Sequence, residues 1–103
     1  AIQINQKLNQ VDCDVLCFSF VGKNWGYLKP TDNHGVYGAD EHWTAVWTKV
    51  WRREFVGNTR FQALPRGSDV YFTYDIWAKH PRVCDWEMPL YYYNVYKKGE
   101  PRL

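Results

Sequence analysis

The sequence predicts an all-β fold: a small antiparallel sandwich or barrel of about six strands that carries one disulfide. Short runs of β-branched and aromatic residues, which are typical of strands, recur along the chain, and aromatic residues make up 18% of it. Turn-forming residues separate these runs, and cysteines lie near the first and the last of them. A length of 103 residues suits one domain, so we expect residues 1–103 to form a single unit.

The first third of the chain is expected to hold one central strand. Residues Ala1 to Asp12 are polar and predict a flexible N-terminal arm. The segment Asp14 to Val21 is apolar at most positions, which is typical of a strand that is buried on both faces. A short extension is expected over Lys23 to Lys29, and the glycines between Pro30 and Asp40 indicate a loop.

The segment Trp43 to Phe55 fits two periodicities. Its apolar residues recur at spacings of three and four, which fits a helix that Asp40 could cap. Its residues also alternate as in a strand, with Trp43, Trp47 and Trp51 on one side. We predict a strand, because Trp, Thr and Val lose rotamer freedom in helices and favour extended structure.

The C-terminal half predicts three further strands. Arg60 to Leu64 is a short one, and Pro65 to Ser68 forms a turn after it. The alternating run from Asp69 to Trp77 predicts the next strand. A loop from Lys79 to Trp86 then leads to the last strand, Leu90 to Lys97.

The cysteines predict a bridge between the ends of the fold. Cys13 and Cys17 are four residues apart, so on a strand they point to the same face and either could reach Cys84. We predict the pair Cys13 and Cys84, because Cys17 lies among apolar residues that suit a buried free thiol. Cys17 is the alternative partner. Such a bridge would stabilise a small secreted domain by on the order of 4 kcal/mol.

Motifs for catalysis or metal binding are not evident in the sequence. No glycine-rich phosphate loop, nucleophile elbow, His-Glu-x-x-His motif or Cys-x-x-Cys spacing occurs. One polar segment could ligate a metal or hold an acid–base pair, although a solvated loop is the more common role of such residues. Its residues are His34, Asp40, Glu41 and His42. The set His42, Glu54 and Arg60 matches a small ribonuclease site in residue type alone. We expect no catalytic residue, no metal and no cofactor.

Charge and hydropathy narrow the classes of partner. With 13 basic and 11 acidic residues the net charge is +2, which is too even to indicate nucleic-acid binding by itself. The longest apolar run is too short to span a bilayer, so no membrane partner is expected. The polar start at Ala1 fits a mature N-terminus after removal of a signal peptide.

The segment Trp43 to Phe55 is the predicted partner-binding site. As an edge strand it would offer unpaired N–H and C=O groups to a strand of the partner. The candidate contact residues are Trp43, Thr44, Val46, Trp47, Thr48, Lys49, Val50, Trp51, Arg52 and Arg53. Two other functions stay open: a nucleic-acid or carbohydrate module with Trp and Tyr platforms, and a small ribonuclease-like hydrolase. We expect Tyr91 and Tyr93 to lie in the core.

The order and spacing of these elements resemble the fungal MAX effectors, the family of blast-fungus avirulence proteins and ToxB. The resemblance rests on Cys13 to Gly22, Trp43 to Phe55, Thr59 to Leu64, Asp69 to Trp77, Cys84, and Leu90 to Tyr96. It implies a six-stranded sandwich, secretion by a fungal plant pathogen with entry into the host cell, and a monomer that binds host proteins without catalysis. In that family the second strand, here Trp43 to Phe55, pairs with a heavy-metal-associated domain of the host; an immune receptor is the other partner that the resemblance implies.

Overall fold

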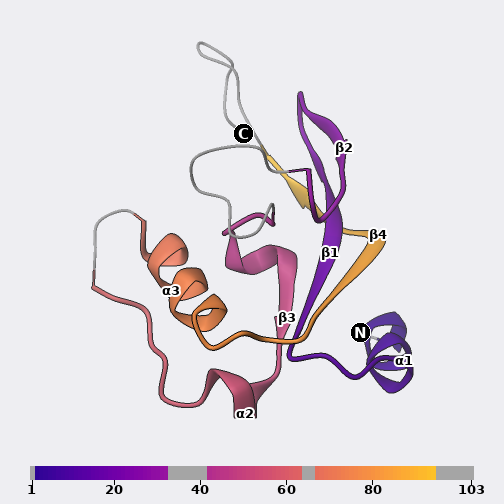
Figure 1. Cartoon of the computed structure of the whole chain (residues 1–103). Helices are drawn as coiled ribbons and strands as arrows, with labels where there is room; N and C mark the ends of the chain where they lie inside the picture. The colour runs from indigo at the N-terminus through magenta and orange to yellow at the C-terminus, as the bar shows by residue number, and fades with distance from the viewer. Residues whose placement is uncertain (1, 33–41, 64–66, 95–103) are drawn as a thin grey trace.

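The computed structural model of the chain describes residues 2–32, 42–63 and 67–94. In chain order its elements are α1 (Ile2–Gln10), β1 (Val15–Gly22), β2 (Gly26–Leu28), the 3-10 helix η1 (Val46–Thr48), β3 (Lys49–Trp51), α2 (Arg53–Val56), α3 (Ser68–Trp77) and β4 (Val83–Tyr93). Figure 1 shows the strands gathered around β1, with α3 and α1 on opposite sides of it. Among these helices, none combines the length and the apolarity that a membrane crossing requires.

One mixed sheet forms the centre of the described structure. β1 pairs antiparallel with β3 through residues 15–17 and with β2 through residues 20–22. Along its other edge β1 pairs in parallel with β4, with shifts in register near Pro89. A proline within β4 fits an edge strand, since it removes one ladder N–H. The expectation that the first strand is central is confirmed, because β1 has partners on both sides.

The segment predicted as a strand from Asp69 to Trp77 is the helix α3, so that prediction is wrong. Its buried residues are Phe72, Thr73 and Ile76, which is the spacing of one helical face. Tyr74, which shares the alternating pattern with Phe72 and Ile76, is exposed. Packing of the buried face against β1 therefore outweighs the strand preference of the individual side chains.

The core lies between α3 and β1. It contains Val15 and Cys17 from the strand, and Phe72 and Ile76 from the helix. Ile76 is 0% exposed. Half-buried residues surround this cluster: Val46, Trp51, Phe55, Val56, Trp77 and Val83. The helix α3 therefore packs against β1, which is the central strand of the sheet.

The segment Trp43 to Phe55 is not one strand, and that prediction is wrong as well. Only Lys49–Trp51 is extended and paired; a 3-10 helix precedes it and α2 follows it. The side chain of Lys49 turns inward and donates hydrogen bonds to the carbonyls of Trp43 and Ala45. These bonds hold residues 43–48 coiled around the ammonium group, which an extended strand would not allow.

Other expectations are confirmed in part or corrected. Residues 2–10, expected as an arm, form α1, and its Leu8 lines a cavity of about 220 Å³ with Leu16 and Val50. The short extension after Lys23 is confirmed as β2. No strand occurs at residues 60–63, against the prediction for Arg60 to Leu64. The last predicted strand is present as β4, which begins earlier than expected; residues 95–97 lie outside the described residues.

The expected all-β sandwich with one disulfide is wrong. The described part of the chain has four strands in one sheet together with helices, and its three cysteines are free. The thiols of Cys13 and Cys84 are hydrogen-bonded. At 3.2 Å the cysteine pair is not bonded covalently, because a disulfide requires about 2.05 Å between sulfurs. Burial and the hydrogen bond with Cys84 raise the pKa of Cys13 to about 11, so this thiol stays protonated at neutral pH.

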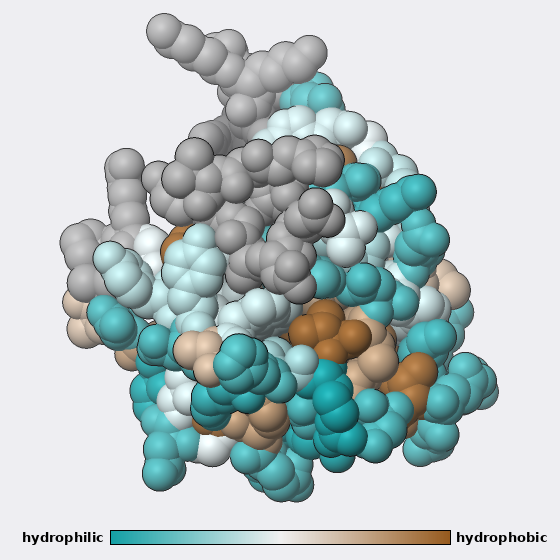
Figure 2. Space-filling model, viewed as in Figure 1, coloured by the Kyte–Doolittle hydropathy of each residue, from teal (hydrophilic) through white to brown (hydrophobic). Residues whose placement is uncertain are grey.

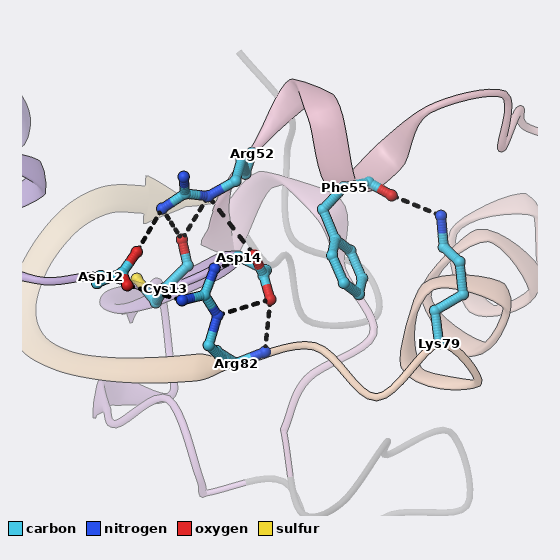
Figure 3. A network of polar contacts seen from close by, with 7 residues as sticks. All are labelled: Asp12, Cys13, Asp14, Arg52, Phe55, Lys79 and Arg82. Atoms are coloured by element: carbon cyan, nitrogen blue, oxygen red, sulfur yellow. Dashed lines mark hydrogen bonds and ion pairs between the residues drawn. The ribbon is translucent and has the colours of Figure 1, made fainter.

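A polar network fixes the start of the sheet. The guanidinium groups of Arg82 and Arg52 both contact the carboxylates of Asp12 and Asp14. Arg52 also donates to the carbonyl of Cys13. Figure 3 shows these groups converging where the chain enters β1 and β4. The network therefore joins three segments that are distant in sequence.

Candidate functional site

A cavity of about 460 Å³ opens between the β1–β2 turn, the segment around η1 and the start of α3. This volume lies within the range of about 300–1,000 Å³ that is usual for ligand sites. We call it the aromatic pocket, because five of its lining residues are aromatic: Phe20, Trp25, Trp43, Trp47 and Tyr93. The other residues that line it are Thr44, Ala45, Gly67, Ser68, Asp69 and Val70.

The rings of the aromatic pocket pack on one another around Phe20, which is 1% exposed. Trp43 and Trp47 meet its ring edge-on, with centroids 5.4 and 5.0 Å away. Trp25 stacks on Trp43 at 6.3 Å, and Trp47 stacks on Tyr93 at 4.8 Å. Trp25 is 48% exposed. Trp25 is thus held in place by Trp43 while about half of its surface stays open to a ligand.

The β1–β2 turn places Trp25 over the pocket. Gly22 and Gly26 face each other across the two strands, and the N–H of Trp25 bonds to the carbonyl of Gly22 at 2.9 Å. Asn24 and Gly26 both adopt positive φ, as the tight turn requires. A Cβ on Gly22 would lie 2.9 Å from the ring of Trp25. Glycine at position 22 therefore lets the indole lie directly against the strand.

Hydrogen bonds from neighbouring elements hold the segment that carries Trp43. Lys49 binds its carbonyl, and Thr73 of α3 donates to the carbonyl of Thr44 at 2.9 Å. The indole of Trp43 donates to the carbonyl of Lys29 at 3.3 Å. Burial lowers the pKa of Lys49 to about 8, although the charge of nearby Asp69 opposes this shift. The floor of the pocket is therefore anchored to α3 and to β3.

The start of α3 supplies the charge of the pocket. Gly67 precedes the helix with φ of 81°, and Asp69 stands in its first turn, where the helix dipole favours an anion. A carboxylate oxygen of Asp69 accepts the N–H of Val46 at 3.3 Å. Asp69 is the charged residue among the described lining residues, none of which is Lys or Arg. The pocket therefore combines aromatic faces with one negative charge.

The predicted partner-binding residues lie in several places. Trp43, Thr44 and Trp47 line the aromatic pocket. Thr48 and Lys49 are buried, Val46 and Trp51 pack against the core, and Val50, Arg52 and Arg53 line the cavity beside α1. The structure thus brings only part of the predicted set to one surface, because residues 43–55 do not form a continuous edge strand.

Most residues that line the aromatic pocket lie outside the predicted contact set, and Trp25, Asp69 and Tyr93 are the ones that the proposed site depends on. No feature of the sequence marks either Trp25 or Asp69 as part of a site. Trp25 lies in a turn, and Asp69 precedes a run of apolar residues. Tyr93 was expected in the core together with Tyr91, but they are 37% and 44% exposed. Both Tyr rings stack on Trp47, which belongs to a segment distant in sequence.

The residues considered for catalysis do not converge as a set. His34, Asp40 and Glu41 lie outside the described residues. The Nε2 atom of His42 lies 2.7 Å from a carboxylate oxygen of Asp85. Arg60 donates to the carbonyls of its neighbours Gly57 and Thr59. Glu54 lies in α2. No contact among the described residues thus supports the ribonuclease-like set.

Comparison with known proteins returns no match. No protein-family model matches the chain, and no curated protein or solved structure does so either. The case for a function therefore rests on the residues themselves, above all on the geometry of the aromatic pocket.

Proposed function

We propose that this chain is a binding protein that takes a cationic side chain of a partner protein into the aromatic pocket. The observation that carries the proposal is the combination of indole faces from Trp25, Trp43 and Trp47 with the carboxylate of Asp69 in one cavity. An ammonium or guanidinium group is attracted to the face of a Trp ring by about 0.5–2 kcal/mol. A carboxylate beside those rings adds attraction for the same charge.

The same features argue against the other binding functions. A nucleic acid would bring phosphates close to Asp69, and no Lys or Arg is found among the described residues that line the pocket. A neutral sugar could stack on Trp25 or Trp43, and its hydroxyl groups could donate hydrogen bonds to the carboxylate of Asp69. It carries no positive charge, so a preference for cationic over neutral ligands separates a cationic side chain from a carbohydrate.

The proposal keeps some of the expectations drawn from the sequence and drops one of them. A binding function without catalysis, and a protein as the partner, are retained. Pairing of a partner strand with an exposed strand over Trp43 to Phe55 is not retained, because these residues do not form such a strand. Secretion by a fungal pathogen and a host protein as the partner, whether a heavy-metal-associated domain or an immune receptor, stay predictions that follow from the family resemblance.

The proposal is tested by calorimetric titration with a set of short peptides that differ at one central residue: Lys, trimethyl-lysine, Arg, Gln or Glu. We expect the cationic members to bind and the Gln and Glu members not to bind. Trp25→Ala and Asp69→Asn should each weaken binding by about tenfold, as loss of one cation–π or ionic contact implies. The matched controls are Tyr92→Ala, an exposed aromatic of β4 outside the pocket, and Asp75→Asn, an exposed carboxylate of α3.

Two results would contradict the proposal. If none of the cationic peptides binds, the aromatic pocket does not recognise a positively charged side chain. If oligosaccharides or single-stranded oligonucleotides bind and the cationic peptides bind no better than the Gln peptide, the function is that of a carbohydrate or nucleic-acid module.

A further inference from the structure

We propose that Cys17, His42 and Asp85 form a binding site for Zn²⁺, separate from the aromatic pocket. A sulfur, a ring nitrogen and a carboxylate oxygen from these residues all lie within 4.8 Å of one another. None of the three residues lines the aromatic pocket. The spacing in sequence gave no sign of the cluster, because each ligand comes from a different segment of the chain.

Strand register brings two of the ligands together. Cys17 of β1 and Asp85 of β4 are direct neighbours in the parallel pairing, so their side chains project from the same face of the sheet. His42 reaches this face from the segment before η1, and its ring lies beside that of Trp77, with centroids 5.9 Å apart. The sheet and the helix that covers it thus place a third ligand over the strand pair.

The chemistry of the three groups suits zinc. Thiolate, imidazole and carboxylate are its usual protein ligands, at about 2.0–2.3 Å. Tetrahedral geometry at those lengths separates ligand atoms by about 3.3–3.8 Å. The His42–Asp85 contact of 2.7 Å would open, and the widest separation of the cluster, up to 4.8 Å, would close. Side-chain rotation on the scale of an ångström is sufficient for both changes.

Charge and access are also compatible with an ion. The Cys17 thiol would release one proton on binding, and the resulting thiolate with the Asp85 carboxylate would neutralise the two positive charges. Cys17 and His42 are buried, whereas the Asp85 side chain is 42% exposed. An ion can therefore enter from the Asp85 side, where a water molecule would complete the coordination. The neighbouring ammonium of Lys49 is engaged by main-chain carbonyls.

A catalytic Cys-His-Asp arrangement fits these residues less well. A nucleophilic sulfur must reach its substrate, but Cys17 is 2% exposed and sits in a strand with partners on both sides. A metal ion needs only a path for itself and one open coordination position. The cluster is therefore better suited to hold an ion than to attack a bound substrate.

Cobalt titration tests the site, because a thiolate bound to Co²⁺ produces a charge-transfer absorption that other ligands do not. The hydrogen-bonded thiols of Cys13 and Cys84 could also bind metal, so the starting protein is the full chain with Cys13→Ser and Cys84→Ser. We expect one equivalent of Co²⁺ to produce the absorption and Zn²⁺ to abolish it by displacement. Addition of Cys17→Ser should remove the absorption altogether.

Two further variants keep the test decisive if Cys17→Ser does not fold. Asp85→Asn alters a partly exposed ligand and should weaken Co²⁺ binding at least tenfold, whereas Asp75→Asn, an exposed carboxylate of α3, should leave it unchanged. Absence of the absorption in the Cys13→Ser, Cys84→Ser protein would overturn the proposal. Equal affinity in the Asp85→Asn and Asp75→Asn proteins would overturn it as well.

Discussion

The guanidinium of Arg82 lies against the carboxylate of Asp14, with Nη2 of Arg82 3.1 Å from Oδ1 of Asp14 (Figure 3). The main-chain N–H of Arg82 donates to the other carboxylate oxygen at 2.9 Å, and the N–H of Asp14 donates to the Arg82 carbonyl at 2.7 Å. Asp14 immediately precedes β1 and Arg82 immediately precedes β4. The contact therefore aligns the two parallel strands from which Cys17 and Asp85 project.

Acid should destabilise the protein through Asp14. Hydrogen bonds from the Arg82 side chain and backbone hold the pKa of Asp14 below its usual value of 3.8. As the pH falls below 3.8, Asp14 takes up a proton more readily in the unfolded chain than in the folded chain. The stabilising effect of the Asp14 charge is therefore present above pH 3.8 and lost below it. In Asp14→Asn the free energy of unfolding, measured by urea titration between about pH 3 and pH 6, should depend less on pH.

The control for this experiment is Asp75→Asn, since Asp75 is exposed on α3. It should retain the pH dependence of the original protein. An unchanged profile in Asp14→Asn would show that the ionic contact does not govern the junction of the two strands.

Truncation of Ile76 should be costly because this residue is completely buried against β1. We expect Ile76→Ala to lower the free energy of unfolding by about 2–5 kcal/mol, as is usual for a large aliphatic residue in a core. Tyr71→Ala, on the exposed side of the same helix, should change it by less than about 0.5 kcal/mol. Equal effects in the two variants would contradict the packing of α3 on the sheet.

Replacement of Lys49 should loosen the pocket as well as the fold. In Lys49→Met the carbonyls of Trp43 and Ala45 lose their donor, and an unsatisfied buried acceptor costs about 1–3 kcal/mol. We expect lower stability in denaturant titrations and weaker binding of the cationic peptides. Arg53→Met, an exposed change nearby, should affect neither quantity; if it matches Lys49→Met, the inward lysine has no special role.

All three cysteines should be titratable as thiols after unfolding. In the folded protein Cys17 should react slowest with an alkylating reagent, because it is 2% exposed and burial raises its pKa to about 12. Mass spectrometry of the alkylated peptides gives both results. Only one reactive thiol in the unfolded protein would mean that the other two are bridged.

Part of this fold could be predicted from local sequence. β1 was recognisable because apolar residues occupy every position from 15 to 21 except Ser19, and such a run is typical of a central strand. α3 was not, since its Tyr, Phe, Thr and Val residues favour strands and only contacts with β1 show which of its faces is buried. For residues 43–48 the deciding interaction is the burial of one lysine, which composition does not reveal.

The aromatic pocket could be predicted only in its central part. Trp43 and Trp47 lay in the predicted contact segment and do line the cavity. Trp25, Asp69 and Tyr93 join them through the β1–β2 turn, the start of α3 and the end of β4. Figure 2 shows one face of the molecule, on which hydrophilic residues surround small, separate hydrophobic areas.

The most direct test of the account is the site of ligand contact, read from the indole N–H signals of the six tryptophans in a ¹⁵N–¹H correlation spectrum. Titration with the lysine peptide should shift the signals of Trp25, Trp43 and Trp47, which line the pocket. The signals of the other tryptophans, at positions 51, 77 and 86, should stay in place. Shifts confined to this second group, or the same shifts with the Gln peptide, would contradict recognition of a cationic side chain by the aromatic pocket.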